Sequence, residues 1–351
     1  MDPQGAPTTY AVTCLYGLEP VLADEVHERL GAQGTVHWCE VVFVFDGRPA
    51  RLRELRVAGN VFLLFDEFPI GHTVPDLDAL CSRLRSLPIE QWEERAREFR
   101  EPSDQDISVS VRRRGEHNFT YEDVEERAVE VLAAATGRKV TLEPRRLELR
   151  IEIDGASCRL KGRLTPAMLS ERPYRRYRVS GETDPALTAA MVRLSRLAPD
   201  DVFLDPFCGG GTIPIERALT GGAAAVVAGE VKENRIACAV GNAHLAGVPI
   251  MFGQWDASAL PFADRTFTRL VTVPPQSDPE GGVPWRLDRF AGLLRECLRV
   301  LRHGGIMVCL MERGPLFGST LKHLSVTWRP AKLACNWKGR QWTIYTLEKT
   351  L

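Results

Sequence analysis

The sequence predicts an α/β protein whose C-terminal half forms a mostly parallel sheet ending in an antiparallel hairpin, preceded by smaller α+β units. Apolar strand-like runs alternate with helical segments from residue 202 to about residue 313, which is typical of a parallel sheet covered by helices on both faces. Two strand-like runs flank Lys338-Gly339 and predict a terminal hairpin. In the N-terminal half, strands and helices interleave in shorter units.

The composition indicates a globular protein of two or three domains. The chain has 351 residues, of which 44% are hydrophobic and 26% charged. Its formal net charge of −1 excludes a generally basic nucleic-acid-binding protein, so any site for a polyanion must be local. Nine cysteines without a CxxC pair argue against a disulfide framework and a structural zinc site, so we expect no metal.

The sequence carries no signal for membrane insertion or export. Its first residues, MDPQGAPTTYAV, have neither a basic start nor a long apolar stretch. No segment approaches the roughly 18 apolar residues of a membrane span. We therefore expect a cytoplasmic protein with no membrane partner.

Residues 1–72 are expected to form the first α+β unit. The pattern predicts a strand over 10–16, a helix over 19–31 ended by Gly31, a strand over 36–47 ended by an Asp-Gly turn, a short helix over 50–60 and a strand over 61–68. Strands and helices therefore interleave within this unit.

Residues 73–165 are expected to form a second unit with a different order. Two consecutive helices over 76–87 and 89–100 lead to a strand over 106–114, a helix over 121–137 and two strands that meet at Asp154-Gly155. The strand over 106–114 ends in three arginines, which are suited to bind phosphate: Arg112, Arg113 and Arg114.

Residues 166–184 read as a basic linker before the C-terminal domain, residues 185–351, which opens with a helix over 185–198. From Arg145 to Arg178 the chain has 10 Lys or Arg against 4 Asp or Glu. Within this stretch, RPYRRYR interleaves arginines, which bind phosphate, with tyrosines, which stack on unpaired bases. A solvated, arginine-rich linker is the alternative. The arginines expected to bind RNA here are Arg172, Arg175, Arg176 and Arg178.

The segment VFLDPFCGGGTIPIERAL, residues 202–219, has the pattern of a strand, a glycine-rich turn and a helix. The strand ends at Asp205 and three consecutive glycines follow. Glycines let the backbone approach a ligand with positive φ angles, and a helix N-terminus offers free N–H groups. The spacing is neither GxGxxG nor a P-loop, which argues against a phosphate-binding loop. A tight turn that simply requires glycine is the structural alternative.

Two further acidic residues follow the next strand-like runs. Glu230 ends one run, at a position where doubly wound folds bind ribose hydroxyls. Asp256 follows the next run, where its carboxylate can accept from an adenine amino group. A surface acid and a turn residue are the alternatives for the two positions. Because the strands are parallel, Asp205, Glu230 and Asp256 are expected at one edge of the sheet, where such folds bind ligands.

These motifs resemble the class I S-adenosylmethionine-dependent methyltransferases and, more narrowly, the THUMP-containing RNA methyltransferases that make N2-methylguanosine in tRNA. The similarity rests on DPFCGGGT, GEVKENRIACAVGNAHLAGV and QWDASALPF, with RPYRRYR just before the cofactor domain. It implies a Rossmann fold with a seven-stranded, mostly parallel sheet and an antiparallel terminal hairpin in residues 185–351. It also implies a ferredoxin-like domain in residues 1–72 and a THUMP RNA-binding domain in residues 73–165.

The resemblance implies S-adenosyl-L-methionine as cofactor and RNA as partner, most simply a tRNA whose acceptor end the THUMP half holds. Glu230 is expected at the ribose hydroxyls, and Asp256 with Ala257 at the adenine. The other residues expected to bind the cofactor are Asp205, Phe207, Gly209, Gly211 and Thr212.

The expected catalytic loop departs from the family pattern of Asn or Asp, then Pro-Pro, then an aromatic residue. It lies in LVTVPPQSDPEGG, residues 270–282, where an apolar run stops at two prolines and opens into a polar loop. The resemblance implies that an acceptor side chain and a proline-loop carbonyl hold the guanine amine while the aromatic stacks on the base. Val273 cannot accept a hydrogen bond, and losing one positioning group typically costs about 100-fold to 1000-fold in rate. The expected catalytic residues are Pro274, Pro275, Gln276 and Asp278.

Three outcomes are open for this loop. Backbone carbonyls with Gln276 or Asp278 compensate, or the loop serves a different substrate, or catalysis is lost and an RNA-binding or partner protein remains. The intact cofactor motifs favour an S-adenosylmethionine-dependent tRNA (guanine-N2)-methyltransferase. A methyltransferase for another RNA and a non-catalytic RNA-binding protein are the alternatives.

Overall fold

A computed structural model describes residues 7–99, 106–144, 147–276, 287–312, 314–323 and 328–350. The chain divides into two compact units. Unit 1 contains Ala23–Leu169 with the strand that precedes Cys14, and unit 2 contains Ser170–Leu351 with the short segment Leu15–Leu22.

Unit 1 is built on one eight-stranded sheet with the order β2-β3-β1-β4-β8-β7-β5-β6. Antiparallel pairing of β4 with β8 joins the strands of the two expected N-terminal domains. The expected division at residue 72 therefore lies within the part of the chain that builds one continuous sheet, and two separate domains here stay a prediction. The strands are β1 (Thr8–Thr13), β2 (Gly34–His37), β3 (Glu40–Phe45), β4 (Val61–Pro69), β5 (Ile107–Arg114), β6 (Val140–Thr141), β7 (Leu147–Asp154) and β8 (Ser157–Arg163).

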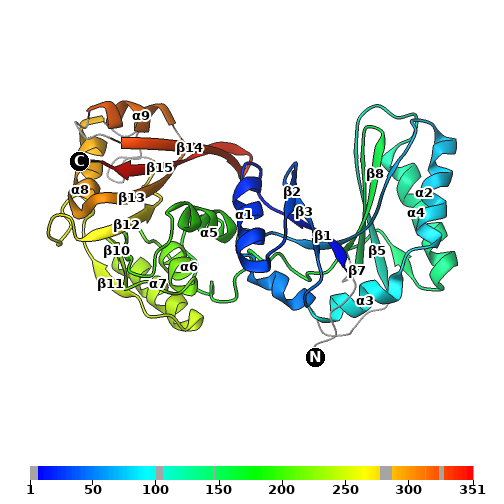
Figure 1. Ribbon diagram of the computed structural model, residues 1–351, viewed down its shortest axis with the longest axis horizontal. Helices are drawn as coiled ribbons and strands as arrows, with labels where there is room; N and C mark the ends of the chain where they lie inside the picture. Colours follow the sequence, from blue (N-terminus) through cyan, green and yellow to red (C-terminus); the bar gives the residue numbers. More distant parts are fainter. Residues whose placement is uncertain are drawn as a thin grey trace. The chain divides into compact units, whose positions relative to one another are not determined.

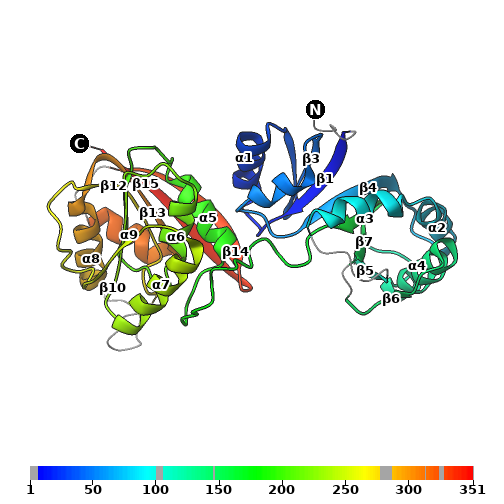
Figure 2. The same cartoon turned by 90° about the horizontal axis from the view of Figure 1, so that it is seen from below.

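The helices of the N-terminal half follow the predicted order. In Figures 1 and 2, α4 lies beside α2 and against β5. The Thr120 side chain accepts the Asp123 N–H to start α4, and Gly137 ends the helix with a φ angle of +67°. The helical elements are α1 (Glu19–Leu30), η1 (Pro49–Glu54), η2 (Val74–Asp76), α2 (Leu77–Arg85), α3 (Ile89–Arg97) and α4 (Tyr121–Thr136).

The single strand predicted over 36–47 is wrong, because the segment is a hairpin. Strands β2 and β3 turn at Trp38-Cys39, where Cys39 has a φ angle of +57°. Val36 pairs with Val41 across the hairpin. Neither Trp38 nor Cys39 is a usual turn residue, so the apolar run concealed the turn.

Unit 2 contains the mostly parallel seven-stranded sheet that the resemblance implies, and the predicted fold class is confirmed. The order is β11-β10-β9-β12-β13-β15-β14, with parallel pairing from β11 to β13 and antiparallel pairing on both sides of β15. Strand β14 thus runs in the direction of β13, so it ends on the same edge as the parallel strands. The strands are β9 (Val202–Asp205), β10 (Ala225–Glu230), β11 (Met251–Gln254), β12 (Phe267–Thr272), β13 (Leu301–Met311), β14 (Trp328–Trp337) and β15 (Arg340–Lys349).

Helices cover both faces of this sheet. Figure 1 shows α5, α6 and α7 on one side and α8 and α9 on the other. Under α8 and α9, Phe290, Leu294 and Phe317 are buried against the sheet residues Leu270 and Met307. Across the described residues, no helix combines the length and apolar character that crossing a membrane requires. The helices are α5 (Pro185–Leu194), α6 (Thr212–Leu219), α7 (Glu233–Ala246), α8 (Leu287–Val300) and α9 (Gly314–His323).

Candidate active site

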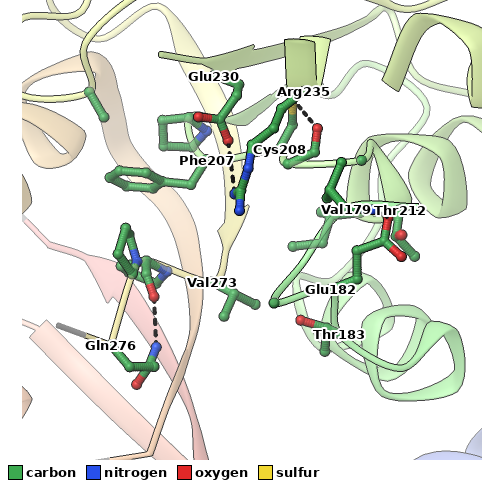
Figure 3. Close-up of a pocket in the computed structure, with 18 of the residues that line it drawn as sticks. Val179, Glu182, Thr183, Phe207, Cys208, Thr212, Glu230, Arg235, Val273 and Gln276 are labelled. Carbon is green, nitrogen blue, oxygen red and sulfur yellow. Dashed lines mark hydrogen bonds and ion pairs between the residues drawn. The ribbon is translucent and has the colours of Figure 1, made fainter. Parts of the chain in front are cut away.

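A pocket of about 860 Å³ lies in unit 2 at the carboxyl edge of the sheet. Its walls come from the ends of β9, β10, β11 and β12, from the segment before α5 and from the β14–β15 turn. Figure 3 shows part of this lining, including Phe207, Glu230 and Val273. This volume is within the range of small-molecule sites, about 300–1,000 Å³. Among the described residues, no group of three or more His, Cys, Asp or Glu is placed to hold a metal ion. The predicted residues that line the pocket are Phe207, Gly209, Thr212, Glu230, Asp256, Ala257, Pro274, Pro275 and Gln276.

The glycine-rich turn between β9 and α6 forms one wall of the pocket. Gly209 and Gly211 have φ angles of +52° and +85°, which residues with side chains rarely adopt. A Cβ on Gly211 would lie 3.1 Å from the Ala239 Cβ, so α7 packs directly on the turn. Gly209 lines the pocket, whereas Gly211 shapes the wall from behind.

Asp205 is fully buried at the end of β9 and does not line the pocket. Its Oδ1 accepts hydrogen bonds from Thr272 Oγ1 at 2.8 Å and from the Phe207 N–H at 3.1 Å. The expectation that Asp205 contacts the cofactor is therefore corrected, because its carboxyl lies behind the wall and joins β9 to β12. Burial raises the pKa of Asp205 to about 7, although the two hydrogen bonds lower it.

Glu230 is the acidic group that the end of β10 presents to the pocket. Its Oε1 accepts the Lys232 N–H at 3.2 Å, and its Oε2 lies 3.6 Å from Arg235 Nη1. Figure 3 shows Glu230 beside Arg235, away from Thr212 and Gln276. These contacts orient the carboxylate, and its remaining lone pairs are suited to accept from ribose hydroxyls.

Trp255, which the sequence patterns do not single out, lines the pocket next to Asp256. A Cβ on Gly229 or Gly253 would lie 1.9 Å or 2.0 Å from its ring atoms, so the indole lies directly on these two paired glycines. Asp256 is exposed and accepts the Ser258 N–H at 2.8 Å. An aromatic surface beside a carboxylate suits an adenine, and glycines at neighbouring strand positions are the signal for such a ring.

Asn242 on α7 ties the segment before α5 to the glycine-rich turn. It is fully buried, and its Oδ1 accepts the Tyr177 N–H at 3.0 Å. Its Nδ2 donates to the Tyr177 carbonyl at 2.8 Å and to the Gly210 carbonyl at 2.9 Å. Asn242 therefore positions one pocket wall, and its sequence signal is a residue of low helix propensity in the middle of a helix.

Two arginines expected to bind RNA form buried ion pairs instead. Arg172 Nε lies 2.9 Å from Glu216 Oε1 on α6, and Arg175 Nη2 lies 2.5 Å from Glu182 Oε2. All four side chains are at most 9% exposed. The RNA-binding expectation is corrected for these two arginines, because their guanidinium groups are desolvated and paired inside unit 2. The segment expected to be a linker is part of this unit from residue 170 onward.

The other arginines expected to bind RNA have different surroundings. Arg113 donates to the Gly115 carbonyl and lies 3.1 Å from His117 Nδ1. The Arg114 guanidinium lies 3.6 Å from the ring centroid of Trp38, which is exposed. Their binding of RNA stays a prediction. The exposed members of the set are Arg112 and Arg114 in unit 1 and Arg176 and Arg178 in unit 2.

The expected catalytic loop follows β12 and lines the pocket from Val273 to Gln276. Val273 offers no side-chain acceptor. Gln276 Nε2 donates to the Pro274 carbonyl at 2.6 Å (Figure 3). Gln276 Oε1 accepts the Glu312 N–H at 2.9 Å. Both ends of the Gln276 amide are therefore used within the protein. Asp278 lies outside the described residues.

The chemical groups that line the pocket fit a nucleoside cofactor that carries a charged tail. Glu230 provides an oriented carboxylate, Trp255 an aromatic surface, and the turn at Gly209 an accessible backbone. The loop from Val273 to Gln276 provides a second wall at which a substrate can meet that cofactor. S-adenosylmethionine fits this set of groups.

The buried carboxyl of Asp205 predicts a pH-dependent stability. Its pKa in the fold, about 7, lies above its ordinary value of 3.8, so between these pH values the folded protein binds a proton that the unfolded chain has lost. Its contribution therefore becomes less favourable as pH rises from about 4 to 7. We therefore compare the free energy of unfolding of Asp205→Asn with that of the natural chain, measured by urea unfolding. As pH is raised from 5 to 8, this difference should shift by about 2–3 kcal/mol in favour of Asp205→Asn.

This comparison uses the change between the two pH values, because Asn keeps the accepting oxygen but adds a donor at the Asp205 Oδ2 position. Among the described residues, that oxygen has no hydrogen-bond partner. The cost of the added donor is the same at both pH values. An equal stability difference at pH 5 and pH 8 would contradict the raised pKa.

Comparisons with known proteins agree on one family. A family model described as "RMKL-like, methyltransferase domain" matches residues 172–334. The tRNA (guanine(6)-N2)-methyltransferase of Thermus thermophilus is 33% identical over 329 residues, which are 88% of this chain and 92% of that protein. The tRNA (guanine(6)-N(2))-methyltransferase THUMP3 of Mus musculus is 29% identical over 179 residues, which are 47% of this chain and 35% of that protein.

Structural comparison gives the same result. The crystal structure of TrmN from Thermus thermophilus matches with a TM-score of 0.84 and 28% sequence identity, over 97% of this chain and 99% of that chain. The resemblance found in the sequence is confirmed, while the THUMP assignment stays a prediction. This chain belongs to the family of S-adenosylmethionine-dependent tRNA (guanine-N2)-methyltransferases.

Proposed function

We propose that this chain transfers a methyl group from S-adenosylmethionine to the exocyclic N2 amine of guanosine 6 in tRNA. The position follows the two relatives described above, both named for guanine 6. The observation that carries the proposal is a single pocket with Glu230 on one wall and the loop from Val273 to Gln276 on another. A nucleoside cofactor and a base can meet only where such walls face one space.

Within this pocket, we assign Glu230 to the ribose hydroxyls and Asp256 with Ala257 to the adenine. When bound, S-adenosylmethionine supplies an electrophilic methyl group on a sulfonium. Asp205 and Gly211 act indirectly, because they hold the glycine-rich turn from behind. The other residues that we assign to the cofactor are Phe207, Gly209 and Thr212.

The base side requires hydrogen-bond acceptors. The guanine N2 lone pair is delocalised into the ring, so acceptors must hold the amine in the orientation that exposes the lone pair. Methyl transfer forms the nitrogen–carbon bond, breaks the sulfur–carbon bond and releases one N2 proton. We assign the Pro274 carbonyl as an acceptor, since it receives the Gln276 amide on one lone pair and has a second. Pro275 holds the loop backbone in shape beside it.

We also propose that unit 1 holds the acceptor end of the tRNA. Arg112 and Arg114 are exposed at the end of β5, and Arg114 stacks on the exposed Trp38. Guanidinium groups beside an aromatic ring suit phosphate and an unpaired base. In unit 2, Arg176 and Arg178 are exposed and suited to further phosphates.

A non-catalytic RNA-binding protein is the second candidate, and the loop favours it in one respect. Val273 offers no acceptor, and the Gln276 amide is hydrogen-bonded at both ends within the protein. Cofactor binding would then serve to stabilise the fold that binds RNA.

The first test is the product itself. We expect tRNA lacking the modification, incubated with this chain and S-adenosylmethionine, to gain N2-methylguanosine at position 6, mapped by nuclease digestion and mass spectrometry. Glu230→Ala is the control and should give no product. Calorimetric binding of the cofactor without methylation of any tRNA would favour the non-catalytic alternative.

The second test concerns cofactor affinity. Glu230→Gln should raise the dissociation constant for S-adenosylmethionine about 10-fold to 100-fold, because hydrogen bonds to a charged carboxylate are lost. Isothermal calorimetry measures this directly. Glu233→Gln is the matched control, since Glu233 is exposed in the first turn of α7 and does not line the pocket. Equal affinities for the two variants would remove Glu230 from the cofactor site.

The third test concerns the altered loop. If Val273 leaves a catalytic acceptor missing, Val273→Asn should raise the single-turnover rate on tRNA about 10-fold to 100-fold. The affinity for S-adenosylmethionine should not change. Val273→Leu, which has no acceptor, is the control. An unchanged rate for Val273→Asn would assign the acceptor role to the loop carbonyls alone.

A further inference from the structure

The loop from Val273 to Gln276 has no aromatic side chain on which a base can stack. The Gln276 side chain cannot fill this role, because its amide is held by the Pro274 carbonyl and the Glu312 N–H. Enzymes that act on a base extruded from its helix commonly hold it against aromatic or apolar side chains. Another element of the same pocket would therefore have to supply the surface on which the base stacks, and an aromatic ring suits this role.

The turn of the β14–β15 hairpin brings such a surface to the pocket. Trp337, at the end of β14, lines the pocket together with Trp342 of β15. Their ring centroids lie 5.1 Å apart at an interplanar angle of 57°. Trp342 is 7% exposed and Trp337 is half-buried, so the inner indole supports the outer one.

The turn has the backbone geometry of a tight two-residue hairpin turn. Lys338 and Gly339 have φ angles of +51° and +70°, and Trp337 pairs with Arg340 across them. Two central residues with positive φ match the tight turn that the twist of a hairpin favours. The position of Trp337 therefore follows from the pairing of β14 with β15.

Two cations accompany this tryptophan. Lys338 Nζ lies 4.5 Å from the Trp337 ring centroid, and both Lys338 and Arg340 line the pocket. Arg340 Nη1 lies 2.7 Å from Glu312 Oε1, and the Glu312 N–H binds Gln276. The hairpin turn is thus joined to the expected catalytic loop through one residue.

The order of the strands separates this group from the cofactor residues. Glu230 ends β10 and Asp256 follows β11, and both strands lie on one side of β9 in the sheet. The loop of Val273 follows β12 on the other side, and β13, β15 and β14 lie beyond it. Trp337 therefore belongs to the side of the pocket that the substrate uses, with the loop between it and the cofactor residues.

We propose that the target base stacks on Trp337, and that Lys338 and Arg340 contact the phosphates that flank this base. Trp342 acts as a positioning residue that supports the Trp337 ring. The inference rests on the proposed function because it takes an RNA nucleotide as the group that enters. An aromatic ring with two cations matches a nucleotide, since the base requires a face and the phosphates require positive charge.

The test uses the full chain with Trp337→Ala, Trp337→Phe and Gln341→Ala. Gln341 is exposed on the same hairpin and does not line the pocket, so its variant is the matched control. Affinity for tRNA transcripts is measured at fixed salt with S-adenosylhomocysteine present, together with kcat/KM for methyl transfer. We expect Trp337→Ala to lower both about 10-fold to 100-fold, Trp337→Phe to restore them largely and Gln341→Ala to leave them unchanged.

Cofactor affinity separates a local effect from a loss of folding. Each variant should bind S-adenosylmethionine as the natural chain does, because the residues assigned to the cofactor lie on other strands. If Trp337→Ala also lost cofactor affinity, the tRNA affinities of Trp337→Leu and Trp337→Phe would be compared instead. Both replacements are large enough to keep the packing of the hairpin, and only phenylalanine is aromatic. Equal tRNA affinity for these two would overturn the inference.

The outcomes distinguish the inference from the proposed function. If the natural chain methylates tRNA and Trp337→Ala is equally active, the inference is overturned and the proposed function stands. Binding without methylation, weakened by Trp337→Ala and restored by Trp337→Phe, would support the inference and overturn the function. Trp285 lies outside the described residues. Loss of tRNA affinity with Trp285→Ala but not with Trp337→Ala would assign stacking to Trp285 and overturn the inference.

Discussion

The hydrogen bond between Asp205 and Thr272 fixes the site, because it joins the two strands from which its two loops depart. Asp205 ends β9 before the glycine-rich turn, and Thr272 ends β12 directly before Val273. Strands β9 and β12 are neighbours in the parallel sheet. A shift at either strand end therefore moves the glycine-rich turn relative to the loop from Val273 to Gln276. Asp205 thus ties two strands together behind the pocket, and its burial raises its pKa.

The basic segment before α5 likewise contains residues that have a structural role where the sequence suggested a binding role. Its composition suggests an RNA surface, yet Arg172 and Arg175 neutralise the buried carboxylates of Glu216 and Glu182. Removing either arginine would leave an uncompensated buried charge, which is costly in a low-dielectric interior. Asn242 joins the same segment to the glycine-rich turn through two hydrogen bonds to the Tyr177 backbone and one to the Gly210 carbonyl. Part of the positive charge in this segment therefore stabilises the fold around the pocket. Only the exposed arginines remain suited to bind RNA.

The sequence predicted most of the fold because its helices and strands follow regular apolar periods with glycine at their ends. It placed Glu230, Asp256 and Gly209 at one pocket because parallel strands end on one edge. It placed Asp205 at the cofactor because spacing locates a residue along the chain but not the direction of its side chain. It did not find Trp255 or Trp337, since their positions depend on glycines in a neighbouring strand and on the pairing of a late hairpin. The hairpin at Trp38-Cys39 lacked any usual turn residue.

Val273 and Gln276 replace the acceptor and the aromatic residue of the family's loop, and this is compatible with membership of the family. A site requires chemical groups at certain positions in space, and residues from different parts of the chain can supply them. The acceptor and the stacking surface act on the substrate through geometry, and any element that reaches the same space can supply them. The loop keeps the Pro274 carbonyl, and Gln276 links that loop to Glu312 and so to Arg340 on the hairpin. Gln276, although it is not aromatic, therefore links the loop to the β14–β15 hairpin through Glu312. The Gln276 amide is then a structural part of the site. Its two partners explain why a glutamine suits this position, because it must donate to the Pro274 carbonyl and accept the Glu312 N–H.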